Sequence, residues 1–277
     1  MERTPNRHSV DDSAALRIES RIREALDGYP ATLVPLIGQS YGPTSIQQAW
    51  REFMPGGSAQ FTDDNAHGEL FFSWLFHCWC PGSEKGSETL DPQLNGVPPT
   101  RAFLGRHAAD INPLLRRYLE ACLETPFGFY QITECRPGRG FRARDLMTRV
   151  QLEVIDRVAS SSLRNGEVIF ARVPLVDGIR VVDAIAPVSF PASFRGYFVK
   201  QRPGSTSQER SDSELRKSYF DLLAIHLRAR LPEIRDSSGD VIDGPATYLC
   251  GNAGAHPAEV IFGPEQEPGA VHRDERS

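Results

Sequence analysis

The chain has 277 residues, of which 40% are hydrophobic and 24% are charged, and its formal net charge is −5. This composition is ordinary for a globular protein, and it allows one large domain or two small ones around a core of normal size. The acidic balance excludes a generic binder of polyanions, so any basic surface has to be local.

Cysteine usage and hydropathy indicate the compartment. The five cysteines are odd in number and irregularly spaced, at Cys78, Cys80, Cys122, Cys135 and Cys250. The first residues are polar and lack the apolar core of a secretory signal, and the longest dense apolar run, residues 70–80, is too short to span a bilayer. We therefore expect free thiols, a cytoplasmic location and no membrane partner.

The first part of the chain, residues 1–125, is predicted to be a helical region. Helices are expected over residues 13–26, 31–37, 45–54, 67–79, 100–109 and 112–123. Ser45 with Gln48 three residues later is typical of a capping box, and Asn112 before Pro113 is typical of an N-cap followed by proline in the first turn. Segment 67–79 is apolar almost all round, which predicts a helix in the centre of the core.

The second part, residues 126–200, is predicted to be a small antiparallel β-barrel-like domain. Strands are expected over residues 129–135, 141–146, 151–156, 167–174 and 179–186. Asp177 and Gly178 lie between two apolar runs, which is a strong hairpin signal because both turn positions need positive φ. Several short strands cannot leave their edges open safely, so we expect the sheet to close or to curl into a half-open barrel.

The last part, residues 201–277, is predicted to contain a polar linker over 201–212, an amphipathic helix, a short β hairpin and a flexible tail. The helix is expected over 213–231, with one apolar face formed by Leu215, Tyr219, Leu222, Leu223, His226 and Leu227. The hairpin is expected within 234–250, around Ser238 and Gly239, and the tail begins near residue 251. The three parts together predict the α+β fold class.

Several short motifs occur in an order that resembles a known family. They are residues 129–132 (FYQI), 137–140 (PGRG), 144–148 (RDLMT) and 166–173 (GEVIFARV), with residues 71–76 (FFSWLF) before them and 238–240 (SGD) after them. In this order they resemble a bacterial family of uncharacterised proteins that often carry a SEC-C zinc motif at the C-terminus. The resemblance covers roughly residues 45–250.

The chain departs from this family at two places. Arg149 stands where the family usually has glycine, and the cysteine and histidine ligands of the SEC-C motif are missing, since the C-terminal segment holds only Cys250, His256 and His272. The resemblance therefore implies no zinc site at the C-terminus, and the family supplies no established catalytic residues.

The sequence alone assigns no metal ligand, cofactor or catalytic residue. His77, Cys78 and Cys80 are the obvious metal candidates, but they are too close in sequence to converge on one ion, and zinc usually needs a second pair of ligands. That pair would have to come from the isolated residues His67, His107, Cys122 or Cys135. A nucleophilic cysteine is not expected in this apolar segment, and no P-loop or Gly-x-Ser-x-Gly pattern occurs.

Asp145 allows two interpretations. It lies between two predicted strands, where its carboxylate can accept hydrogen bonds from turn amides and hold a corner of the barrel. A catalytic role would need a partner carboxylate or histidine, and none is close in sequence, so we favour the structural role.

A local basic segment carries the remaining binding hypothesis. Five arginines occur between positions 136 and 149, with Asp145 as the one acid: Arg136, Arg139, Arg142, Arg144 and Arg149. We call this segment the arginine hairpin. Near Phe129, Tyr130 and Phe141 it is compatible with a barrel that binds single-stranded nucleic acid by stacking and phosphate contacts. The alternative, which we favour, is a solvated edge that protects the sheet from aggregation.

The sequence therefore predicts a bacterial cytoplasmic protein that acts as a non-catalytic binding or adaptor protein, with a protein as its possible partner. A nucleic-acid-binding module that uses the arginine hairpin is the first alternative. An enzyme of unknown class is the second, and it would require a pocket in which Asp145 or a histidine meets another polar group.

Overall fold

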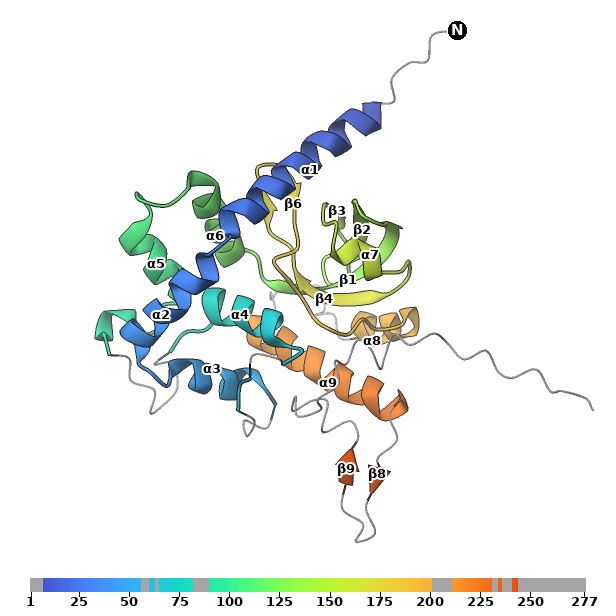
Figure 1. Ribbon diagram of the computed structural model, residues 1–277. Coiled ribbons are helices and arrows are strands. Elements are labelled where there is room, and N and C mark those ends of the chain that lie inside the picture. Colours follow the sequence, from blue (N-terminus) through green and yellow to red (C-terminus); the bar gives the residue numbers. More distant parts are fainter. Residues whose placement is uncertain are drawn as a thin grey trace, which may run out of the picture.

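The computed structural model is a mixed structure of helices and a curled sheet (Figure 1). It describes residues 7–55, 60–62, 65–81, 90–200, 211–230, 234–235 and 241–243. Most of the predicted linker over 201–212, the turn at Ser238 and Gly239, the tail from residue 251 and Cys250 lie outside the described residues.

The helical region follows the expected elements closely. Its helices are α1 (Arg7–Leu26), α2 (Tyr29–Tyr41), α3 (Ser45–Phe53), α4 (Gly68–His77), α5 (Pro99–His107) and α6 (Pro113–Glu124), with a short 3-10 helix η1 (Pro92–Leu94). Helix α6 has the predicted cap, because the side-chain oxygen of Asn112 accepts a hydrogen bond from the backbone N–H of Leu114 at 2.8 Å.

The capping box predicted at the start of α3 is wrong. The N-cap residue is Thr44, and the hydroxyl of Ser45 donates to the carbonyl of Gly42 at 2.6 Å instead of accepting from the helix. The side-chain amide of Gln48 donates along the helix to Glu52 at 3.2 Å rather than reaching back to the cap. The positive φ of Gly42 turns the chain sharply just before the helix, and this geometry offers Ser45 a nearby carbonyl acceptor.

The sheet has seven strands in the order β5-β6-β3-β2-β1-β4-β7. These strands are β1 (Phe127–Arg136), β2 (Gly140–Asp145), β3 (Gln151–Val154), β4 (Val168–Arg172), β5 (Leu175–Val176), β6 (Ile179–Arg180) and β7 (Ala184–Ile185). The sheet is not purely antiparallel as expected, because β3 and β6 pair in parallel at Val154 and Arg180. The predicted hairpin at Asp177 and Gly178 joins β5 to β6, with φ of 48° and 85° at these two residues.

The short helical segments after β3 complete the sheet region. Helix α7 (Ala159–Ser162) follows β3, and the 3-10 helix η2 (Ala192–Phe194) and helix α8 (Arg195–Lys200) follow β7. Further along the chain, β8 (Ile234–Arg235) and β9 (Val241–Asp243) form a separate antiparallel pair, as the predicted late hairpin requires.

Both faces of the curled sheet are covered around β4. One face packs on the helices, and the core on this side includes Leu33 of α2, Phe71 of α4, Leu119 of α6 and Phe170 of β4. On the opposite face a second apolar cluster includes Ile169, the neighbour of Phe170 in the same strand. Every residue of β4 is therefore buried, since alternate side chains enter the two clusters.

Helix α9 (Asp212–Arg230) lies beneath α4 and beside the sheet (Figure 1). The six residues of the predicted apolar face are all buried, namely Leu215, Tyr219, Leu222, Leu223, His226 and Leu227. The core that contains them also includes residues on both sides of position 126. The domain boundary expected there stays a prediction.

Helix α1 is attached to the sheet by a partly buried ion-pair network. The guanidinium of Arg23 donates to Asp156 at 2.6 Å and to the carbonyl of Val182 at 2.9 Å. Glu19 of the same helix is buried and lies 3.4 Å from Arg23 and 3.3 Å from Arg157. These contacts fix the orientation of α1 on the strands.

Candidate functional site

Polar side chains converge where helices α4 and α6 meet the sheet. Asp183, between β6 and β7, is the centre of the group: its Oδ2 accepts a hydrogen bond from the hydroxyl of Ser73 at 2.5 Å, and its Oδ1 accepts one from Tyr118 at 2.6 Å. Burial by itself raises the pKa of Asp183, but the neighbouring His77, the charge of Arg172 and the two hydroxyl groups lower it, and the net direction is downward. The carboxylate is therefore ionised at neutral pH.

His77 and Cys122 complete this group. The donor atoms of His77, Cys122 and Asp183 all lie within 4.8 Å of one another, and His77 Nε2 is 4.0 Å from Asp183 Oδ1. Burial lowers the pKa of His77 to about 3, so its imidazole is neutral at pH 7. Burial also raises the pKa of Cys122 well above its ordinary value, so this side chain is a protonated thiol.

Arg172, the last residue of β4, connects this group to its surroundings and is only 1% exposed. Its guanidinium donates to the carbonyl of Cys122 at 3.2 Å and to the sulfur of Cys78, and it lies 3.9 Å from Asp212. It also stacks over the ring of Phe127, 4.3 Å from the ring centroid. The surrounding groups raise the pKa of Arg172 despite the opposing effect of burial, so the buried guanidinium stays charged.

Asp212, at the start of α9, is the second anion near Arg172. It accepts hydrogen bonds from Cys78 Sγ at 3.0 Å and from the backbone N–H of Phe127 at 2.9 Å. We call the whole group the buried polar cluster; it consists of Ser73, His77, Cys78, Tyr118, Cys122, Arg172, Asp183 and Asp212.

The buried polar cluster is poorly suited to catalysis by a nucleophilic cysteine. A reactive cysteine needs a lowered pKa and access to solvent. Burial raises the pKa of Cys78 to about 12, even though the nearby Arg172 acts to lower it. Both thiols are therefore poor nucleophiles, and the hydrogen bonds of the cluster connect α4, α6, α9 and the sheet.

The residues His77, Cys78 and Cys80 diverge, as their close spacing predicts. His77 points to Asp183, Cys78 contacts Arg172 and Asp212, and the thiol of Cys80 lies 3.4 Å from the carbonyl of Cys78. Of the isolated residues that the sequence offered as further ligands, the structure brings Cys122 beside His77.

The arginine hairpin lies on β1 and β2 and carries its own counterions. Arg142 is 3.0 Å from Glu134, and Arg136 forms ion pairs with Glu153 and Glu134. These pairs alternate positive and negative charge across neighbouring strands, an arrangement that weakens attraction for a phosphate backbone.

The other members of the arginine hairpin lie apart from these pairs. Arg139 is exposed in the turn between β1 and β2, Arg144 is half-buried near the end of β2, and Arg149 is exposed with a positive φ of 68°. Glycine accommodates such a φ most easily, so Arg149 adopts a backbone conformation that is uncommon for a residue with a side chain.

The stacking surface expected beside the arginines is not available. The rings of Phe129, Tyr130 and Phe141 are 1%, 6% and 0% exposed, because both faces of the sheet are covered. The structural role favoured for Asp145 is confirmed: its Oδ1 accepts hydrogen bonds from the backbone N–H groups of Met147 at 2.7 Å and Thr148 at 3.1 Å.

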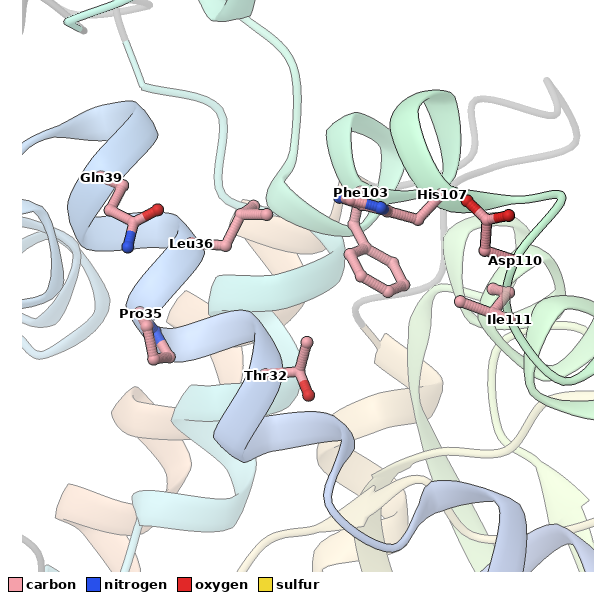
Figure 2. A pocket seen from close by; sticks show the side chains of 8 residues that line it. All are labelled: Thr32, Pro35, Leu36, Gln39, Phe103, His107, Asp110 and Ile111. Atoms are coloured by element: carbon pink, nitrogen blue, oxygen red, sulfur yellow. The ribbon is translucent and has the colours of Figure 1, made fainter.

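An open groove lies between helices α2 and α5, away from the sheet. Figure 2 shows Thr32, Pro35, Leu36 and Gln39 along α2, and Phe103 and His107 on α5, with Asp110 and Ile111 in the segment that follows. The groove has a volume of about 350 Å³, at the lower end of the range for ligand sites. Its floor is apolar, and the exposed carboxylate of Asp110 lies at one end. We call this feature the α2–α5 groove.

Comparison with protein-family models, with curated proteins and with solved structures found no match. Within the described residues, no helix is long and apolar enough to cross a membrane.

Sequence reasoning missed Asp183, Arg172 and the α2–α5 groove. Arg172 left a signal that could have been used, because it is the one charged residue in the apolar run 168–173. An arginine inside a strand buried on both faces has to be paired, so such a pattern indicates a buried ion pair. Asp183 has no comparable signal, since its partners are far away in sequence.

Proposed function

We propose that this chain is a non-catalytic binding protein, and that the α2–α5 groove is the site at which it binds a protein partner. The observation that supports this proposal is the contrast between two features. The ionisable groups that converge lie mostly in the core, whereas the groove presents an apolar surface to solvent. In this account the curled sheet is a β-barrel-like scaffold on which the helical region is held.

The shape of the groove favours an amphipathic helix as its occupant. Small-molecule sites enclose most of their ligand, but Thr32, Pro35 and Gln39 are exposed along one wall of this groove. A helix that lays its apolar face between two helices uses such an open surface well, with apolar residues at helical spacing as its anchors. Phe103 supplies a rigid aromatic floor and is itself 4% exposed.

The charge at one end of the groove indicates the polarity of the partner. Asp110 is exposed, and it has no ion pair among the described residues. A lysine or arginine beside the apolar face of the partner helix would meet this carboxylate. An ion pair at the rim of an interface contributes about 1 kcal/mol or less, so it sets orientation more than affinity.

The thiols are consistent with a reducing compartment. Cys78, Cys80, Cys122 and Cys135 are all free, which supports the cytoplasmic location proposed from the sequence. A nucleic-acid partner is less well supported, because Arg136 and Arg142 of the arginine hairpin are paired with glutamates and the neighbouring rings of Phe129, Tyr130 and Phe141 are buried.

The test uses a displayed library of amphipathic helical peptides, with affinities of selected peptides measured by fluorescence anisotropy on the full chain. Thr32→Arg places a long charged side chain in the groove at an exposed helical position, and Ala31→Arg is the matched control on the same helix outside the groove lining. Selected peptides should bind the wild type and Ala31→Arg equally and lose at least about tenfold, or 1.4 kcal/mol, with Thr32→Arg.

Two results would refute the proposal. One is that no helical peptide is enriched over the naive library. The other is that enriched peptides bind Thr32→Arg as tightly as they bind the wild type, which would place the binding surface elsewhere.

A further inference from the structure

Three side chains with different donor atoms meet in the core from three separate elements. His77 comes from the end of α4, Cys122 from α6, and Asp183 from the segment between β6 and β7. Their donor atoms lie within 4.8 Å of one another, and the side chains of His77 and Asp183 are 3% and 9% exposed. We propose that these three residues bind a divalent transition-metal ion of the zinc class.

The donor set and its spacing fit such an ion. Zinc takes imidazole nitrogen, thiolate sulfur and carboxylate oxygen at about 2.0–2.3 Å, so two ligand atoms around a tetrahedral ion are about 3.5 Å apart. The observed separations, none above 4.8 Å, therefore exceed that spacing by about 1.3 Å at most. Calcium and magnesium prefer sets made of oxygen alone, and a set with one nitrogen and one sulfur selects against them.

The neighbouring groups are placed as supporting partners for these ligands. The hydroxyls of Ser73 and Tyr118 donate to the two oxygens of Asp183 and fix the plane of its carboxylate. The guanidinium of Arg172 donates to the carbonyl of Cys122 and holds that turn of α6 in place. Hydrogen bonds of this kind orient ligands in known metal sites and strengthen binding.

Metal binding at this site has a defined proton balance. A thiol has to lose its proton when its sulfur becomes a metal ligand, so binding releases one proton from Cys122 to solvent.

The role of such an ion would be structural. His77 and Cys122 are buried and the side chain of Asp183 is 9% exposed, and closed sites of this kind are characteristic of structural zinc, whereas catalytic zinc keeps an open position for water or substrate. The second oxygen of Asp183 or a buried water would complete the tetrahedron. The ion would then join α4 and α6 to the sheet, independently of the α2–α5 groove.

The experiment loads the full chain with Zn²⁺ or Co²⁺ and measures metal per chain by mass spectrometry after gel filtration. About one ion per chain is expected, with a sulfur-to-cobalt charge-transfer band. Cys122→Ser and His77→Gln should each lower the affinity at least about tenfold. Cys135→Ser is the matched control, because this free thiol lies on β1 outside the group, and it should leave both the affinity and the band unchanged.

X-ray absorption of the zinc-loaded wild type needs no variant, so it decides the question even where a substitution prevents folding. One sulfur at about 2.3 Å with a nitrogen and oxygen shell would support the site. The proposal is overturned if the reconstituted chain holds no stoichiometric metal, if the absorption spectrum lacks sulfur, or if both folded ligand variants retain the metal.

Discussion

Arg172 gives the sharpest test of how the core is held together. The guanidinium is 1% exposed, and it contacts the sulfur of Cys78, the carbonyl of Cys122 and the ring of Phe127, with Asp212 at 3.9 Å. Arg172→Met keeps much of the side-chain volume and removes the charge and its donors. The variant should lose stability because it leaves buried acceptors unpaired.

The expected magnitude follows from the burial of these partners. Removing one member of a buried ion pair costs about 3–5 kcal/mol, because the remaining charge stays uncompensated. Asp212 is 27% exposed at its side chain, so water can replace part of the lost contact. We therefore expect Arg172→Met to lower the free energy of unfolding by about 3 kcal/mol, the lower end of this range.

Arg142→Met on the neighbouring part of the sheet is the matched control. Arg142 and its partner Glu134 are 49% and 45% exposed, and an ion pair of this kind contributes about 1 kcal/mol or less. Urea unfolding followed by circular dichroism measures the free energy of unfolding of both variants. The slope of this free energy against urea concentration should be the same in both variants and the wild type. Equal losses for Arg142→Met and Arg172→Met would refute the argument from burial.

Three further predictions concern pH, backbone geometry and nucleic acid. Burial lowers the pKa of His67 to about 4, so its contribution to stability is full above pH 6.5 and is lost as the pH falls towards 4. His67 should account for a loss of about 2 kcal/mol between pH 7 and 5, and His67→Leu should reduce the pH dependence in urea titrations by that amount, leaving the part due to His77. Gly140→Ala should cost more than about 2 kcal/mol in thermal unfolding, because its Cβ would lie 2.1 Å from a carbonyl of β3, whereas Gly138→Ala, with open space around it, should cost about 1–2 kcal/mol. Labelled DNA and RNA should show no micromolar binding in anisotropy titrations at physiological salt; salt-sensitive binding that Arg144→Ala abolishes would restore the nucleic-acid hypothesis for the arginine hairpin.

Local signals in the sequence predicted the elements well. Asp177 and Gly178 specify their turn through their own backbone preferences, and Asn112 caps α6 through a contact only two residues away. Helical spacing identified the buried face of α9. Ser45 shows where this reasoning fails, because its hydroxyl turned to a carbonyl that the preceding glycine brought close.

The buried polar cluster could not be predicted in the same way. Ser73 and Tyr118 are 110 and 65 residues from Asp183 in sequence, and only the packing of α4 and α6 on the sheet brings them together. The α2–α5 groove depends likewise on the distance between two helices, which periodicity does not encode. Both features are products of tertiary packing and leave little trace in local pattern.

The most direct measurement of the central claim is hydrogen–deuterium exchange of the full chain with and without a selected helical peptide. We predict slower exchange in α2 and in the segment from α5 to Ile111, with no change in the arginine hairpin. Protection confined to other surfaces, or no protection at a saturating peptide concentration, would contradict the assignment of binding to the α2–α5 groove.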